Sequence, residues 1–542
     1  MTLPFIRFIE NSDKVHVAQQ QADMYYNVVI GPRIQFHPLD KEKGGLQQLP
    51  LNREGWLKLL IAPLTWLIQH HPSLSAVVGD HLKANPAYLK MPSVDLSRVI
   101  SYQAIRTTLE INKILEDEHN NPCDLGDHTR PLWRIVVVHV QDDSTFYLLF
   151  SFQFQELFCV LTILTACIRC LEKHTMSDGA GIIALTEQLV ERLNHEASNP
   201  SSPDLLTIVP SPAEDVPASM ESRIDCTPGI RTWLREARAM FLPAFIKKAL
   251  EKKSWAGEFP ADPCNPHITQ IGYMALTESE TQQVMLAAKS RHTTVHSILF
   301  AAILFATKAV FMSKVVDAHN MVVEKDTLHF STPISLRNVL SPAVWRFDLG
   351  NYVSDHVTRD VSVQLETQFW DLAKQIREEV VHRTQTPQGV RSLVEVMGLL
   401  NYLPKHDGGW AEFMRSFSVL EQNGRMHSLR CSNLGKGWDQ TKTTTTEKTG
   451  EPVTNPVVFK VVDGLFSQGA ATTTVCLCLN VATANNVMTV AMSWQKEAFT
   501  GRDRGELMLA EFKRVLLDAT TPAKVGLNYN FCDALLHLSQ EK

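Results

Sequence analysis

The sequence predicts a two-lobed α/β protein, with mixed sheets flanked by helices. Its 542 residues exceed what one ordinary hydrophobic core accommodates, so two domains are expected. Hydrophobic residues make up 44% of the chain and charged residues 20%, a balance typical of globular proteins. Helical and strand patterns are mixed in both halves, which fits two similar lobes. We expect an N-terminal lobe over residues 1–225, a crossover segment over 226–265 and a C-terminal lobe over 266–542.

In the N-terminal half, residues 56–70 place apolar side chains at helical spacing and are followed by Pro72, which fits a helix end. Residues 134–140 and 146–152 predict two strands separated by a polar turn. Their nearly continuous hydrophobicity indicates burial on both faces. Residues 180–193 then predict a helix.

The C-terminal half repeats this mixture after two irregular segments. Residues 197–217 are rich in Ser, Pro and Asp and predict a surface linker, and residues 441–456, with four successive threonines, predict a loop. Helices are predicted at residues 277–289, 295–308, 361–382 and 506–517, and strands at 328–334, 428–434, 457–466, 475–482 and 487–494.

Charge and cysteine usage exclude several classes of protein. The net charge is -6 with scattered Lys and Arg, which argues against nucleic-acid binding. The ten cysteines are dispersed and the N-terminus lacks a signal-peptide pattern, so we expect free thiols in the cytoplasm. Cys167 and Cys170 have no second ligand pair, so no metal is expected. No run of about 18 apolar residues predicts a transmembrane helix.

One short run carries chemistry: His174-Thr-Met-Ser-Asp178-Gly179. It lies between the predicted strands and a predicted helix, so His174 would project from a turn, and Gly179 would allow the backbone that such a turn needs. A neutral imidazole suits the removal of a proton from an attacking hydroxyl, which contributes about 10²–10⁴-fold to rate. So short a pattern also occurs by chance, and the alternative for His174 alone is a surface or structural histidine.

Seven further segments form an ordered set along the chain. They are residues 23–28, His71-Pro72-Ser-Leu74, Pro131-Leu-Trp133-Arg, Trp255-Ala-Gly257, Thr332-Pro333-Ile-Ser-Leu-Arg337, Gly350-Asn351 and Ser432-Asn433-Leu434-Gly435. Through these segments the sequence resembles the fungal alcohol acetyltransferases, within the superfamily of chloramphenicol acetyltransferase, plant BAHD acyltransferases and condensation domains. Residues 23–28 resemble an N-terminal helix of the family, and the DFGWG motif of the plant branch is missing.

The resemblance implies a tunnel between the lobes, with the acyl-CoA entering from one face and the acceptor from the other. It implies that His174 is the base and that Asp178 pairs with Arg337 instead of contacting substrate. Ser432 and Asn433 would line the tunnel near the developing oxyanion. The alternative for these two residues is a role in the strand and its turn.

The resemblance implies transfer of acetyl from acetyl-CoA, as a co-substrate and with no tightly bound cofactor, to a small hydrophobic alcohol. Acetylation of an amine is the alternative, since the same base serves both. We expect a monomer, cytoplasmic or peripheral to the endoplasmic reticulum or lipid droplets. Residues 232–255, with four lysines near their end, predict either a solvated basic helix or contact with a membrane or with CoA phosphates.

One departure from the family precedes the motif. The strand at 146–152 should lead almost directly into it, but the apolar segment from Phe154 to Lys173 intervenes. We interpret it either as an unspliced intron in the gene model or as an insertion that forms a short helix outside the shared fold. In the second case the chain could be a non-catalytic binding protein, because small displacements of a catalytic group cost about a hundredfold in rate.

Overall fold

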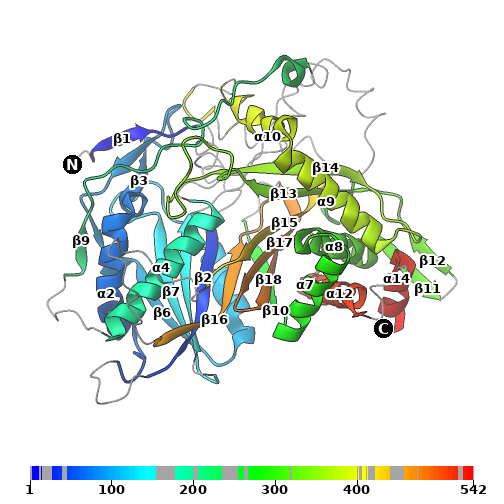
Figure 1. Cartoon of the computed structure of the whole chain (residues 1–542), viewed down its shortest axis with the longest axis horizontal. Coiled ribbons are helices and arrows are strands. Elements are labelled where there is room, and N and C mark those ends of the chain that lie inside the picture. The colour runs from blue at the N-terminus through cyan, green and yellow to red at the C-terminus, as the bar shows by residue number, and fades with distance from the viewer. Residues whose placement is uncertain are drawn as a thin grey trace.

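The computed structural model describes most of the chain, and it shows two lobes side by side (Figure 1). The predicted two-lobed α/β fold is confirmed. The described residues are 3–10, 14, 17, 27–38, 46–143, 145–153, 177–198, 206–234, 254–261, 267–317, 320–399, 401, 406–409, 412, 422–439, 457–472, 474–522 and 529–540.

The first lobe is built on a five-stranded sheet. One of its strands, β16, comes from the C-terminal half of the chain and pairs with β2, so the chain crosses between the lobes (Figure 1). The predicted pair β7 and β8 is buried on both faces, as expected. In spatial order the strands are β16 (Phe459–Gln468), β2 (Asn27–Phe36), β8 (Thr145–Gln153), β7 (Trp133–Val140) and β6 (Ile100–Ile105).

Helices α2 (Arg53–His70) and α4 (Gly179–Ser198) cover one face of this sheet, and α3 (Ile111–His119) packs near the other. The helix predicted at 56–70 starts at Arg53 because Asn52 caps it, accepting the Gly55 N–H at 2.8 Å. The helix that the resemblance implies at residues 23–28 is wrong for residues 27 and 28, since Asn27 begins β2 and pairs with Gln153.

Small sheets flank the two large ones. Their strands are β1 (Phe5–Phe8), β4 (Ala87–Lys90) and β3 (Ala76–Gly79) in one sheet, β5 (Ser93–Asp95) with β9 (Ile208–Pro210) in another, and β11 (Ser313–Asp317) with β12 (Asn320–Val323) in a third. Strand β9 corrects the prediction of a plain linker over 197–217: Val209 is buried, because it pairs with Val94.

The second lobe is built on a six-stranded mixed sheet, and its helices pack on one face (Figure 1). The strands, in spatial order, are β10 (Thr269–Ala275), β18 (Val487–Gln495), β17 (Val475–Ala484), β15 (His427–Lys436), β13 (Leu328–Ser335) and β14 (Val353–Val361). The helices are α7 (Glu278–Ser290), α8 (Val295–Phe311), α9 (Phe369–Gln385), α10 (Pro387–Leu399), α12 (Arg502–Thr520) and α14 (Phe531–Gln540).

Most predicted elements of this lobe are present, with one clear error. The helix predicted at 361–382 begins only at Phe369, because Val361 ends β14 and the following residues form a turn. In that turn Thr367 Oγ1 accepts the Gln364 N–H at 2.8 Å. Apolar spacing alone does not distinguish such a turn from the first turns of a helix.

Each lobe has its own hydrophobic core, and α8 is almost entirely buried in the second. Among the described residues, no single helix has the length and apolar character to cross a membrane. Helices α7 and α8 meet both criteria only when they are taken together, and this pair is bent by 106° at the break between the two helices.

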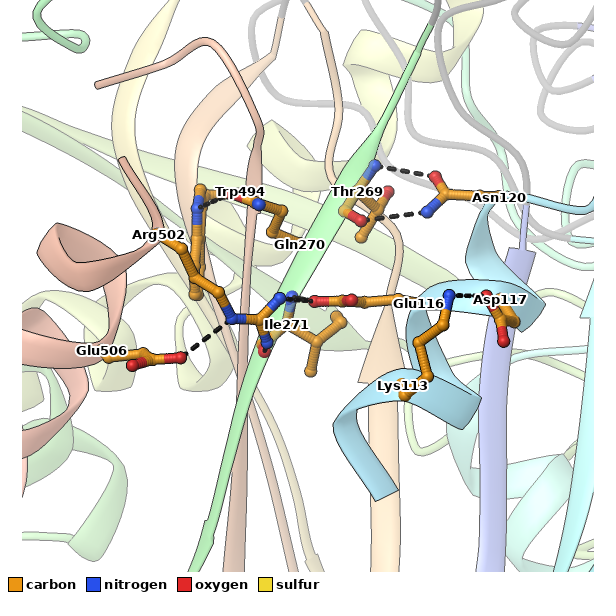
Figure 2. Close-up of polar contacts among 10 residues, drawn as sticks. All are labelled: Lys113, Glu116, Asp117, Asn120, Thr269, Gln270, Ile271, Trp494, Arg502 and Glu506. Carbon is orange, nitrogen blue, oxygen red and sulfur yellow. Dashed lines mark hydrogen bonds and ion pairs between the residues drawn. The ribbon is translucent and has the colours of Figure 1, made fainter. Parts of the chain in front are cut away.

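Polar side chains of α3 and of the residue that follows it join the first lobe to the edge strand β10 (Figure 2). The carboxamide of Asn120 makes the two hydrogen bonds that a further strand would make with Thr269. It accepts the Thr269 N–H at 2.8 Å and donates to the Thr269 carbonyl at 3.0 Å. Glu116 accepts the Ile271 N–H at 2.9 Å and pairs with Arg502 of α12 at 2.7 Å. The edge of this sheet is therefore covered by side chains, and the two lobes are fixed to one another there.

Candidate functional site

The two lobes are also joined beside the motif, by an ion pair. Asp178 precedes α4 in the first lobe, and Arg337 follows β13 in the second. Arg337 Nε lies 2.8 Å from Asp178 Oδ2, and Nη2 lies 2.8 Å from Oδ1, so the contact is bidentate. The Asp178 side chain is 1% exposed and that of Arg337 10%. The expected pairing of these two residues is confirmed.

Both partners are held by further hydrogen bonds. Asp178 Oδ1 accepts the Gly181 N–H at 2.9 Å, so the same carboxylate also caps α4. The Asp178 N–H donates to the Gly350 carbonyl at 3.1 Å, and Arg337 Nη2 donates to the Asp348 carbonyl at 2.9 Å. The end of the motif is thus fixed to the segment that leads into β14.

Glycines near this pair make room for it. A side chain at Gly181 would place its Cβ 2.2 Å from Ser177 Oγ and 3.0 Å from Arg337 Nη2. The expectation that Gly179 supplies an unusual turn backbone is wrong, because Gly179 begins α4. Its lack of a side chain instead admits Leu434, whose Cδ2 would lie 2.3 Å from an added Cβ.

The motif's histidine and the segment before it lie outside the described residues. These include His174, the whole stretch from Phe154 to Lys173, and with it Cys167 and Cys170. The described chain resumes at Ser177, which is buried. The role of His174 therefore stays a prediction, as do both interpretations of the inserted segment.

A second histidine, His71, contacts α4, the helix that follows the motif. His71, in the His71-Pro72 segment, is buried, and its Nε2 lies 2.7 Å from Oε1 of Gln188 on α4. Burial lowers the pKa of His71 to about 4, so its ring is neutral at physiological pH. Two residues on, Ser73 Oγ donates to the Leu349 carbonyl of the second lobe at 2.9 Å.

The face of the six-stranded sheet that lies opposite its helices, here called the lobe-facing face, is polar. Side chains alternate along a strand, so the partners of the apolar Leu429, Cys431, Leu477 and Leu479 point the other way. These partners are small or hydrogen-bonding residues: Ser428, Arg430, Ser432, Cys478, Asn480 and Ser493.

Arg430 is the buried cation of this face. Its Nε donates to Ser331 Oγ at 3.1 Å, and its Nη2 lies 3.8 Å from Asp355 Oδ2, with both charged side chains almost fully buried. Ser432 follows on the same face and is 6% exposed. Asn433 Oδ1 accepts the Gly435 N–H at 2.8 Å, which is a strand-end turn contact. Whether Ser432 and Asn433 line a tunnel stays a prediction.

A buried polar network at the junction of the lobes was not foreseen from the sequence. His119 Nδ1 lies 2.9 Å from the Asn27 carbonyl and Nε2 lies 2.7 Å from Ser467 Oγ, which places the proton on Nδ1. His267 lies between two hydroxyls, with its Nδ1 2.9 Å from Thr472 Oγ1 and its Nε2 3.1 Å from Thr269 Oγ1. Burial lowers the pKa of His119 to about 3 and that of His267 to about 4. Isolated histidines in a sequence carry no signal of such partners.

In the part of the chain that the structure describes, no group of three or more His, Cys, Asp or Glu side chains is arranged to hold a metal ion.

The chain was compared with protein families, curated proteins and solved structures. Residues 265–435 match the family model described as phthiocerol/phthiodiolone dimycocerosyl transferase C-terminus. No curated protein matches the chain in sequence. Among solved structures, polyketide synthase associated protein 5 from Mycobacterium tuberculosis is 14% identical with a TM-score of 0.52, and the alignment covers 96% of this chain and 99% of that one.

Two further structures resemble the chain. The TRI3 trichothecene 15-O-acetyltransferase from Fusarium sporotrichioides is 11% identical, with a TM-score of 0.58 and 94% of both chains covered. A starter condensation domain of rhizomide synthetase, in complex with C8-CoA and Leu-SNAC, is 11% identical, with a TM-score of 0.51 and 97% and 96% covered. The chain therefore has the two-lobed fold of these acyltransferases and condensation domains.

Proposed function

We propose that this protein is a CoA-dependent acyltransferase that moves acetyl from acetyl-CoA to a hydrophobic alcohol, with His174 as the general base. The observation that carries the proposal is the bidentate ion pair between Asp178 and Arg337. It binds the last part of the motif to the opposite lobe, next to the polar lobe-facing face. A base that is set at the junction of two lobes can meet two substrates that arrive from opposite sides.

In the proposed reaction the acceptor oxygen attacks the thioester carbonyl carbon while His174 takes the hydroxyl proton. The tetrahedral intermediate then collapses, the carbon–sulfur bond breaks, and His174 returns the proton to the CoA thiolate. The products are an acetyl ester and free CoA, and the histidine is regenerated. Asp178 takes no part in proton transfer, because both its oxygens already accept hydrogen bonds from Arg337 and one accepts another from Gly181.

Two kinds of match to known proteins support this assignment. The second lobe matches a transferase family over residues 265–435. One protein of the same fold is a trichothecene 15-O-acetyltransferase, and another was solved with C8-CoA bound.

The test is acetyl transfer from acetyl-CoA to a panel of alcohols, sterols and amines, measured as released CoA. His174→Ala should lower turnover at least about a hundredfold and leave the affinity for acetyl-CoA nearly unchanged. His37→Ala, a change at an exposed histidine, should have no effect and serves as the control. Turnover that prefers amines would favour the N-acetyltransferase alternative.

The inserted segment favours a second candidate, a binding protein that keeps the fold without catalysis. Two chains separate the candidates: the full chain, and one that lacks the stretch from Phe154 to Lys173. Transfer by the full chain would exclude the second candidate. Transfer by the shortened chain alone would show that the insertion abolishes activity.

A further inference from the structure

Trp438 has a backbone conformation that bulky residues rarely adopt. Its φ angle is 53°, in the left-handed region, where a large side chain is strained. The residue is nevertheless almost fully buried, with 2% of its surface exposed. Such strain persists only where surrounding contacts fix the residue, and it is concentrated at sites where position matters for function. The contacts of Trp438 therefore indicate what the strained conformation serves.

The side chain of Trp438 crosses from the second lobe into the core of the first. Trp438 lies two residues after β15, and the Gly437 N–H before it donates to the Thr483 carbonyl of β17 at 2.9 Å. The indole itself belongs to the hydrophobic core of the first lobe. It lies against β16 at Gly464, where an added Cβ would be 2.1 Å from Trp438 Cζ3. Only a glycine at that position admits the ring.

Both N–H groups of Trp438 bind α4, the helix that follows the motif. The backbone N–H donates to Glu187 Oε1, and the indole Nε1–H donates to Thr186 Oγ1, each at 2.8 Å. A buried indole N–H needs such a partner. The strained backbone of Trp438 thus presents a main-chain donor and a side-chain donor to neighbouring residues of one helix.

The end of β15 lies along the same face of α4. Leu434 packs on Gly179, which begins the helix, since an added Cβ there would lie 2.3 Å from Leu434 Cδ2. Gly437 packs on Ile183, whose Cγ2 would lie 2.7 Å from an added Cβ. Together with the indole, these contacts advance by about one helical turn at a time, the spacing of a single helix face. The strand end and the motif helix therefore pack as one unit.

We propose that Trp438 is a positioning residue for the acyl transfer, acting through α4 and β15 without touching either substrate. The inference rests on the proposed function. The motif ends where α4 begins, and Ser432 lies on β15 at the lobe-facing face. By binding the helix to the strand end, Trp438 fixes the distance between the motif and that face. A displacement of about 1 Å at a reacting centre costs about a hundredfold in rate.

The test compares Trp438→Ala with Trp494→Ala, a matched change in the core of the second lobe. Trp494 is 0% exposed, and its Nε1 donates to Gln270 Oε1 at 3.0 Å (Figure 2). In folded enzyme, Trp438→Ala should lower kcat for acetyl transfer at least about tenfold and leave KM for acetyl-CoA nearly unchanged. Trp494→Ala should change neither constant by more than about twofold. Trp438→Phe, which keeps a ring but not the N–H, should restore part of the lost kcat.

Hydrogen exchange gives a second measurement that needs no substrate. The amides of residues 179–187 should exchange at least about tenfold faster in Trp438→Ala than in the native protein, and no faster in Trp494→Ala. Equal kcat in the two alanine variants, or unchanged exchange in α4, would overturn the inference and leave the proposed function standing. No acetyl transfer by the native protein would overturn both. If an alanine variant does not fold, Trp438→Phe and Trp494→Phe decide, because equal kcat in these two excludes the positioning role.

Discussion

The two faces of the six-stranded sheet are buried to the same degree but differ in chemistry. On the helix-covered face, Leu429 and Leu479 are 0% exposed and pack into the core of the second lobe. On the lobe-facing face, Arg430, Asn480 and Ser493 are 0–1% exposed. Burial of the apolar face stabilises the fold, whereas burial of the polar face costs free energy unless each group finds a partner. The apolar face thus contributes to the stability of the fold, and the proposed function would draw on the polar face of the same strands.

The largest effect is expected at the cross-lobe ion pair, where the charged groups of Asp178 and Arg337 bind each other at two points. Arg337→Ala leaves the Asp178 carboxylate buried without its counter-charge. We expect unfolding to become easier by about 3–5 kcal/mol, measured by chemical denaturation. The exposed pair of Glu54 and Lys58 gives the control, since Glu54→Gln should change nothing measurable. A loss as small as that of the control would mean that the pair does not join the lobes.

The second-largest loss of stability is expected from truncation of a core leucine. Leu479→Ala removes an entirely buried side chain from the helix-covered face, and we expect a loss of about 2–5 kcal/mol. In enzyme that is still folded, turnover should be close to native, because Leu479 points away from the lobe-facing face. A large fall in turnover of folded protein would contradict the division of roles between the two faces.

The third prediction concerns pH and the buried histidines. The pKa values of His119, His267 and His71 are lowered by burial to about 3, 4 and 4, below the usual 6.5. Below pH 6.5 the unfolded chain therefore binds protons that the folded chain does not, and stability falls as pH falls. Each histidine contributes roughly 1 kcal/mol per pH unit. Denaturation curves between pH 7.5 and 5 should show this slope, and His119→Gln should reduce it.

Asp463 affects the pH dependence of stability in the opposite direction to the histidines. Burial raises its pKa from 3.8 to about 6, although Arg33 partly offsets this. Between these two values the folded chain holds a proton that the unfolded chain has lost, so stability rises as pH falls. Asp463→Asn should therefore steepen the acid loss that the histidines cause. A shallower loss in this variant would show that the carboxyl is ionised in the folded protein at pH 6.

Periodicity and motif spacing predicted the long elements and the cross-lobe pair, but little of the junction between the lobes. The buried helices and the hydrophobic strands β7, β8, β17 and β18 have strong local patterns. Strands β2 and β10, whose apolar patterns are interrupted by glycine, proline or polar residues, were missed, because they are fixed by pairing with residues far along the chain. Asp178 and Arg337 were found through a family spacing, which already encodes the tertiary contact.

Trp438 shows why the rest of the site could not be predicted. Its place shortly after a motif was visible, but its contacts with α4 depend on how β15 ends and on which lobe the indole enters. The same holds for His119, whose partners come from β2 and β16. Such facts belong to the packing of distant segments, which no local pattern contains.

The smallest effect should come from a single hydroxyl on the lobe-facing face. Ser493 is 1% exposed, and its Oγ has no hydrogen-bond partner in the described part of the chain. Ser493→Ala removes a buried polar atom that the fold leaves unsatisfied. Stability should stay the same or rise by up to about 1 kcal/mol, because no hydrogen bond is lost and a desolvation cost is removed.

Ser428 provides the matched comparison on the same sheet. Its Oγ donates to the Trp255 carbonyl at 2.5 Å and accepts the His329 N–H at 2.9 Å. Ser428→Ala should therefore destabilise by about 1–3 kcal/mol, since both partners are left unpaired. Denaturation of the two variants under one condition measures the difference. If Ser493→Ala destabilises as much as Ser428→Ala, the hydroxyl of Ser493 already has a partner, such as a buried water, and the lobe-facing face is better satisfied than its protein contacts indicate.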